Sequence, residues 1–162
     1  FAASQMICRA AAAAAAAPGA SAELSSSQRA RTLPPAFWRD FHMRRAEAAD
    51  HSPRCNDHLA GKLVQALLPE DEQAALAASP SLEADSDIAA FHASFIDRLM
   101  LDAVGRRIRQ IVLVGSGMDS RAFRLDVPPQ LKVIELDEAE VHSAKAAVFD
   151  AAGCRPRCAV RR

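Results

Sequence analysis

The sequence predicts an α/β fold in which helices lead into the first β-α-β-α units of a doubly wound parallel sheet. The prediction rests on a change of pattern along the chain. An unbroken apolar run, Ile111–Val114, ends at Gly115, as is typical of a strand buried on both faces. A second strand pattern, Leu131–Asp137, follows a segment that is compatible with a helix. Strands that alternate with helices indicate a parallel sheet.

The first half of the chain is expected to be helical, because its apolar residues recur at helical spacing between serine and proline breaks. The expected helices cover residues 37–50, 57–68, 70–78 and 87–105. Asp87 is a candidate N-cap of the last one, since its side chain can accept a hydrogen bond from the first turn. The apolar positions of this helix form one stripe: Ile88, Phe91, Phe95, Leu99 and Val104.

The second half is expected to alternate between strands and helices. The first strand covers residues 110–114, and a helical segment runs from the glycine loop to Pro128. The second strand covers 131–137, and an alanine-rich helix, 138–152, comes next. Residues 158–160 begin a third strand. Because the strand pattern stops there, we expect the chain to be the truncated opening of a longer α/β domain.

Composition divides the chain into a tail and a domain. Residues 1–36 combine alanine, arginine and serine with a single acid, Glu23. This composition is typical of an organelle transit peptide and also of a low-complexity tail, so a plastid, mitochondrial or cytoplasmic location fits it. The partial domain is expected over 37–162, with a helical lead-in, 37–106, before a cofactor-binding β-α-β-α part, 107–162.

Charge and composition argue against several classes of function. Twenty Lys and Arg residues balance twenty Asp and Glu residues, unlike the charge of a nucleic-acid binder or a polybasic membrane-surface protein. The alanine run, Ala10–Ala17, is too short to span a bilayer, which needs about 20 apolar residues. The four cysteines include no C-x-x-C pair, so we expect free thiols and no metal site.

The loop after the first strand carries the most informative motif. Gly115 and Gly117 flank Ser116, and Asp119 and Ser120 follow. Two glycines after a buried strand let the backbone turn sharply and approach a ligand without a Cβ in the way. Open α/β sheets bind their ligands at the carboxyl ends of the strands. The loop therefore predicts a nucleotide-like cofactor, with Gly115, Ser116, Gly117 and Asp119 as candidate binding residues.

Two classes of cofactor fit this loop. A dinucleotide prefers G-x-G-x-x-G, but Ser120 occupies the third glycine position and the Asp119 carboxylate repels phosphate. S-adenosylmethionine carries a cationic sulfonium and no phosphate, which suits an acidic loop better. Glu135 and Asp137, at the carboxyl end of the second strand, are candidates for binding the ribose hydroxyls of either cofactor.

A more specific likeness runs through both strands. Phe95-Ile96-Asp97 precedes R-Q-I-V-L-V-G-S-G-M-D-S-R-A-F-R-L at 109–125, and V-I-E-L-D follows at 133–137, with Lys145 downstream. This series resembles the leucine carboxyl methyltransferase family, whose pattern is F-I-D-x-x-L, then R-Q-V-V-x-L-G-A-G-x-D-T-R-x-x-R-L, then E-x-D and a lysine. The resemblance covers about residues 40–160 and implies a Rossmann-like class I methyltransferase fold.

The resemblance also implies roles for the candidate residues. Gly115, Ser116 and Gly117 would line the methionine part of S-adenosylmethionine. Asp137, with Glu135 as the other candidate, would hold its ribose. Asp119 and Arg121 would shape the loop or line the site, and Arg124 would anchor the following helix through a salt bridge.

The chain departs from the family pattern at one ligand position. The family commonly has an arginine just before F-I-D that pairs with the carboxylate of the cofactor, whereas His92-Ala93-Ser94 stands here. A histidine or serine can still hydrogen-bond a carboxylate, but the fixed guanidinium fork is lost.

The function expected from these observations is methyl transfer from S-adenosylmethionine to an oxygen acceptor. By resemblance the acceptor is a carboxylate, on a small molecule or on a protein. No catalytic residue is identified, because acceptor-binding groups would lie on later strands and loops. The alternatives are an NAD(P)-binding oxidoreductase fragment and a catalytically inactive remnant or interaction module.

Overall fold

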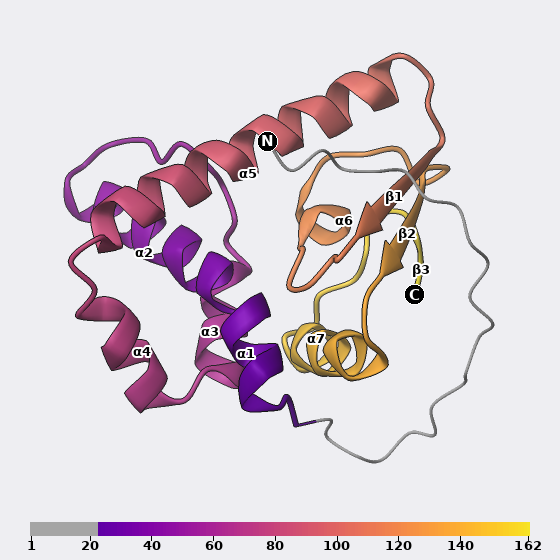
Figure 1. The fold of residues 1–162 in the computed structure, drawn as a ribbon. Coiled ribbons are helices and arrows are strands. Elements are labelled where there is room, and N and C mark those ends of the chain that lie inside the picture. The colour runs from indigo at the N-terminus through magenta and orange to yellow at the C-terminus, as the bar shows by residue number, and fades with distance from the viewer. Residues whose placement is uncertain (1–22) are drawn as a thin grey trace.

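The computed structural model describes residues 23–162. Helices make up one side of the molecule and a small sheet the other, and α5 (Leu82–Gly105) runs along both (Figure 1). The alanine run and the other residues of the expected tail or transit peptide up to position 22 lie outside the described residues.

The helical side is built from five helices within residues 23–162. Those expected over 37–50, 57–68 and 70–78 correspond to α2, α3 and α4. In chain order the five are α1 (Ser26–Thr32), α2 (Pro34–Ala48), α3 (Ala60–Leu67), α4 (Glu70–Ala77) and α5 (Leu82–Gly105).

α1 lies in the segment that composition assigns to a tail. Ser25 and Gln28 form a capping box: the Gln28 N–H donates to the Ser25 hydroxyl at 3.2 Å, and the Ser25 N–H donates to the Gln28 side-chain oxygen at 2.9 Å. Leu33 and Ala36 are fully buried in the helical core. Residues 23–36 are therefore packed against the domain, because their apolar side chains cover part of its core.

α5 begins before Asp87, so Asp87 lies inside the helix and is not its N-cap. Its carboxylate pairs instead with Arg45 of α2 and lies 3.1 Å from Nδ1 of His42. Glu83 and Asp85 lie in the first turn, where negative charge interacts favourably with the helix dipole. The cap expectation was wrong, because tertiary ion pairs with α2 recruit the carboxylate.

The sheet holds three parallel strands in the order β1-β2-β3. β1 and β2 pair in register along their whole length, so they end at the same edge of the sheet. This arrangement confirms the expected α/β class with a small parallel sheet. The bounds are β1 (Gln110–Val114), β2 (Lys132–Leu136) and β3 (Ala159–Arg161), with α7 (Ala139–Ala151) between β2 and β3 in the chain.

The segment between β1 and β2 contains less helix than expected. α6 (Arg121–Arg124) is a single turn, and Leu125 leaves it in an extended conformation. Leu125 and Val127 are buried in the apolar cluster of the sheet. The helix ends early because these two side chains reach the sheet only from an extended backbone, and Pro128 follows at once.

Two apolar clusters hold the layers together. One joins the helices to α7, and the other packs around the sheet. Phe123 of α6 contacts both clusters, and its ring centroid lies 4.4 Å from that of Phe149 in α7. α7 therefore connects the helical side to the sheet, as Figure 1 shows.

Most of the apolar stripe of α5 is exposed: of its five residues, only Val104 is partly buried, against the cluster around the sheet. Small side chains on the other side of the helix, Ala90 and Ala93, are buried instead, and α2 packs closely against α5. An apolar stripe usually faces a core, so tertiary packing here buries the opposite side. The exposed fractions are 66% for Ile88, 61% for Phe91, 50% for Phe95 and 49% for Leu99.

No helix within residues 23–162 is long and apolar enough to cross a membrane.

Leu63 and Phe91 provide a matched test of this packing. Leu63 is fully buried, so Leu63→Ala is expected to lower the free energy of unfolding by about 2–5 kcal/mol. Phe91 is exposed, so Phe91→Ser is expected to change it by at most about 0.5 kcal/mol. Urea unfolding followed by circular dichroism measures both. Equal destabilisation by the two substitutions would contradict the orientation of α5.

Candidate functional site

A cavity of about 580 Å³ lies at the edge of the sheet where β1 and β2 end. Its volume falls in the range of small-molecule sites. One wall is the loop from β1 to α6 together with the end of β2, and it includes Gly115, Ser116, Gly117, Asp119, Ser120 and Asp137. The other wall comes from α1, α2 and α5, and it includes Arg31, Thr32, Arg39, His92 and Ala93.

The glycine loop turns sharply and is tied to the end of β2. Gly115 has φ +63° and Gly117 has φ +45°, a left-handed conformation that a Cβ disfavours. The Gly115 N–H donates to the Leu136 carbonyl at 2.8 Å, and the Gly117 N–H donates to Oδ2 of Asp137 at 2.6 Å. The loop conformation predicted from the two glycines is therefore held by hydrogen bonds from the neighbouring strand end.

Ser116 brings an unsatisfied hydroxyl to the cavity wall. Its side chain is 8% exposed, and its Oγ has no hydrogen-bond partner among the described residues. Buried polar groups are nearly always hydrogen-bonded, and one left unpaired costs about 1–3 kcal/mol. A polar ligand in the cavity would satisfy this hydroxyl.

The two acidic candidates on β2 lie in different surroundings. Asp137 lines the cavity, and its second oxygen, Oδ1, accepts from the Glu138 N–H at 2.8 Å. Glu135 is 1% exposed and does not line the cavity. Its Oε2 lies 2.9 Å from both Nζ of Lys145 and Nε of Arg162. The structure thus brings Asp137 to the glycine loop and directs Glu135 into a buried ion pair.

Lys145, the downstream lysine of the family pattern, is fully buried. Burial lowers the pKa of its ammonium, and the neighbouring Glu135 carboxylate only partly opposes that effect. Nζ also lies 3.3 Å from the backbone carbonyl of Asp119. Lys145 therefore connects Glu135 of β2 to the glycine loop.

Asp119 lines the cavity but does not present a free negative charge to it. The Arg121 guanidinium pairs with its Oδ2, and the Arg121 N–H donates to its Oδ1 at 2.8 Å. Arg121 also binds Asp97 of α5, with Nε 2.7 Å from Oδ1. Because its charge is paired, Asp119 does not repel a pyrophosphate in the way that the sequence alone suggests.

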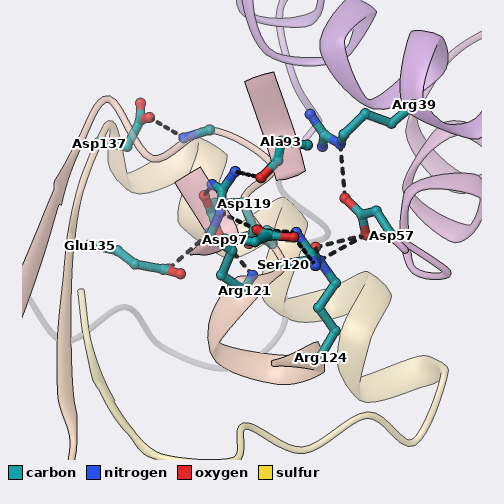
Figure 2. A network of polar contacts seen from close by, with 12 residues as sticks. Arg39, Asp57, Ala93, Asp97, Asp119, Ser120, Arg121, Arg124, Glu135 and Asp137 are labelled. Atoms are coloured by element: carbon teal, nitrogen blue, oxygen red, sulfur yellow. Dashed lines mark hydrogen bonds and ion pairs between the residues drawn. The ribbon is translucent and has the colours of Figure 1, made fainter. Parts of the chain in front are cut away.

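Asp57, just before α3, connects the helical side to the loop (Figure 2). Its carboxylate is 2% exposed; it accepts from Nε of Arg39 at 2.8 Å and from the Ser120 hydroxyl at 2.7 Å. Nε of Arg124 lies 3.6 Å away, and Arg124 pairs further with Asp97 at 2.7 Å. Arg124 thus forms the salt bridges expected of it, but these join α6 to α5 and to Asp57.

The electrostatics of this network favour the charged form of Asp57. Burial alone raises the pKa of the carboxyl, but the guanidinium groups of Arg39 and Arg124 and the Ser120 hydroxyl outweigh it and hold the pKa below its usual range. Burial likewise acts to lower the pKa of Arg124, but its hydrogen bonds to Asp97 and the nearby carboxylates raise it. Asp57 and Arg124 are therefore both held in their charged forms.

The family model described as leucine carboxyl methyltransferase matches residues 32–162. The chain belongs to the leucine carboxyl methyltransferase family. The match includes the whole glycine loop, both strand ends of the cavity, and α2 and α5.

Bacterial relatives agree with this family. Three of them are named as "Putative S-adenosyl-L-methionine-dependent methyltransferase". One from Mycolicibacterium smegmatis is 36% identical over 120 residues, which cover 68% of this chain and 38% of that protein. One from Mycobacterium ulcerans is 34% identical over 131 residues, covering 73% and 42%. One from Frankia alni is 45% identical over 64 residues, covering 40% and 22%. The chain thus spans less than half the length of these curated relatives.

Part of the cavity wall of this leucine carboxyl methyltransferase family member was not predicted from the sequence. Arg31 and Thr32 lie in the segment that composition assigns to a tail, and Arg39 lies in the lead-in helix. The signal that was available is the capping-box spacing of Ser25 and Gln28, which marks a helix start ahead of them. Nothing local to Arg39 in the sequence points to the cavity.

The network predicts a specific acid sensitivity for Asp57. Because the folded-state pKa of its carboxyl is lowered, its contribution to stability is present above the unfolded pKa, about 3.9, and is lost as the pH falls through the folded pKa. Asp57→Asn is expected to lower the free energy of unfolding at pH 7 by about 3 kcal/mol, because it leaves Arg39 and Arg124 without their anion. The deficit relative to the unsubstituted protein should shrink as the pH falls below about 4.

Urea unfolding at a series of pH values from 7 to 2 measures this difference. Asp102, which is exposed near the end of α5 and has no ion pair among the described residues, supplies the control variant Asp102→Asn. That variant should follow the unsubstituted protein at every pH. A deficit for Asp57→Asn that stays constant down to pH 2 would contradict the lowered pKa of the Asp57 carboxyl.

Proposed function

We propose that this chain forms the cofactor-binding part of an S-adenosylmethionine-dependent methyltransferase with a Rossmann-like class I arrangement. The observation that carries the proposal is the convergence on one cavity of the left-handed glycine loop, the unpaired Ser116 hydroxyl and the Asp137 carboxylate. The family match and the names of the relatives support the same function.

The residues that line the cavity fit this cofactor. Gly115 and Gly117 line the cavity and have no side chain, so a ligand can approach the loop backbone closely. The Ser116 hydroxyl can donate to a carboxylate or accept from an ammonium, and the amino-acid part of the cofactor carries both groups. Each Asp137 oxygen accepts one backbone hydrogen bond and retains a lone pair for a ribose hydroxyl.

A dinucleotide is less well supported by the same loop. Ser120, at the third glycine position, is 1% exposed and is committed to Asp57 through its hydroxyl. A pyrophosphate is normally bound at the N-terminus of the helix that follows the glycine loop, but α6 is a single turn. The loop therefore lacks the helix dipole that a Rossmann dinucleotide site uses.

S-adenosylmethionine supplies an electrophilic methyl group on a sulfonium. The chain's own contribution is to bind and orient the cofactor, since alignment of the nucleophile with the methyl group is the main requirement of an in-line displacement. We propose an oxygen acceptor of the carboxylate class, as the family name indicates. A carboxylate is already ionised at neutral pH and needs no general base, which agrees with a cavity whose carboxylates serve as structural and binding groups.

Calorimetric titration with S-adenosylhomocysteine and, separately, with NAD tests the proposal. The chain is expected to bind S-adenosylhomocysteine and not NAD. Gly117→Val should lower the affinity by tenfold or more, because a branched side chain strains the φ of +45° and intrudes on the ligand side of the loop. Asp137→Ala should lower it similarly, because it removes both the ribose acceptor and the hydrogen bond to Gly117.

Gly153 offers a matched control for the glycine variant. It has φ +66° at the end of α7, where an added Cβ meets nothing within 4 Å. Gly153→Val therefore introduces the same kind of backbone strain away from the cavity and should keep the affinity. Binding of NAD alone would assign the site to a dinucleotide, and binding of neither ligand would favour an inactive remnant or interaction module.

A further inference from the structure

Arg39 of α2 reaches the cavity with part of its guanidinium uncommitted. Its side chain is 15% exposed, and Nε donates to Oδ2 of Asp57 at 2.8 Å. The two terminal nitrogens have no hydrogen-bond acceptor among the described residues. Arg39 lines the cavity, and Figure 2 shows its guanidinium bound to Asp57 through one nitrogen only.

The other cationic side chains of the cavity are occupied or exposed. Arg121 uses its guanidinium on Asp97, Asp119 and the Ala93 carbonyl. Arg124 uses its guanidinium on Ser120, Asp97 and the Asn56 carbonyl. Arg31 is 54% exposed and pairs with Glu138 at 2.7 Å.

Of the arginines that line the cavity, Arg39 is the one that has both a fixed position and free donor nitrogens. Its position is fixed because Asp57 is itself nearly fully buried and bound to Ser120. A guanidinium held along one edge presents its other edge as a preorganised fork, which matches the geometry of a carboxylate.

A cofactor bound in the cavity would also require a cationic partner of this kind. If the chain binds S-adenosylmethionine, as proposed above, its methionine carboxylate requires a cationic or hydrogen-bonding partner when it is removed from water. The family pattern has an arginine just before F-I-D, and His92 lines the cavity from the segment that replaces it here. A neutral imidazole offers a single N–H donor, whereas a guanidinium edge offers two.

The position of Arg39 relative to the glycine loop is suitable. Thr32 of α1 lies directly opposite Gly117, since a Cβ built on that glycine would be 3.8 Å from the Thr32 side chain. α1 and α2 are joined through the single residue Leu33, so Arg39 projects into the cavity from the same wall. The amino-acid part of a cofactor that rests on the loop would therefore face this wall.

We propose that Arg39 binds the methionine carboxylate of S-adenosylmethionine through its two terminal nitrogens, in place of the family arginine that is missing from residues 92–94. Asp57 acts as a positioning residue that holds Nε and orients the fork. The inference rests on the proposed function and adds to it the carboxylate-binding residue and the reason for the buried Arg39–Asp57 pair.

A comparison of two ligands on two variants tests this assignment. S-adenosylmethionine and its decarboxylated form differ only by the carboxylate, so their ratio of affinities isolates that group. The unsubstituted chain is expected to bind S-adenosylmethionine about tenfold or more tightly than the decarboxylated form. In Arg39→Gln that preference should disappear, with the affinity for the decarboxylated ligand unchanged within about twofold. Arg39→Lys should keep part of the preference, because a cation remains without the fork.

His92→Ala and Arg31→Gln serve as the competing variants. Each should keep the preference for the carboxylated ligand. The assignment would be overturned if either variant lost this preference while Arg39→Gln kept it. An equal loss of both ligands in Arg39→Gln, with Arg39→Lys behaving the same way, would also overturn it, because the residue would then act only through folding. Failure of the unsubstituted chain to bind either ligand would instead refute the proposed function, and the inference with it.

Discussion

Asp57 carries a buried negative charge that is stabilised by partners from separate parts of the chain. Arg39 comes from α2, Ser120 from the loop after β1, and Arg124 from α6. A buried charge that loses its partners costs several kcal/mol, so the elements that carry the donors must stay within reach of it. This requirement fixes the helical side of the molecule against the glycine loop. The cavity is the space that remains between the two walls.

The loop is held from its other side by β2. The Gly117 N–H is bound by Asp137, and the backbone carbonyl of Asp119 is contacted by buried Lys145. These contacts hold the loop in a left-handed conformation at Gly115 and Gly117. Folding leaves two sets of polar groups unpaired on the walls: the Ser116 hydroxyl and the terminal nitrogens of Arg39. Unpaired polar groups in a half-buried cavity are what a polar cofactor would satisfy.

The positions of the strands, the loop between them and the helices α2, α3, α4, α5 and α7 were predictable, because each depends on a local pattern of apolar spacing or on paired glycines. The expected burial of the first strand on both faces was wrong, since β1 is only partly covered and Val114 is 59% exposed. The distinction between Glu135 and Asp137 was not predictable, since alternation places both on one side of an extended strand. β2 ends at Leu136, so Asp137 follows the turn of the chain toward the loop while Glu135 meets Lys145. α6 was overestimated because the burial of Leu125 against the sheet overrides local helix propensity.

The sequence by itself determined the α/β class, the sharp turn of the glycine loop and the family, because these depend on residues close together in the chain. Only the tertiary structure decided which charges are free. Asp119 was expected to be a bare carboxylate and is neutralised by Arg121, while Arg39, in a segment without any motif, reaches the cavity with unpaired donors. It also decided that most of the apolar stripe of α5 is exposed and its alanine side buried. Charge pairing and helix orientation depend on contacts between distant segments, and no local pattern encodes those contacts.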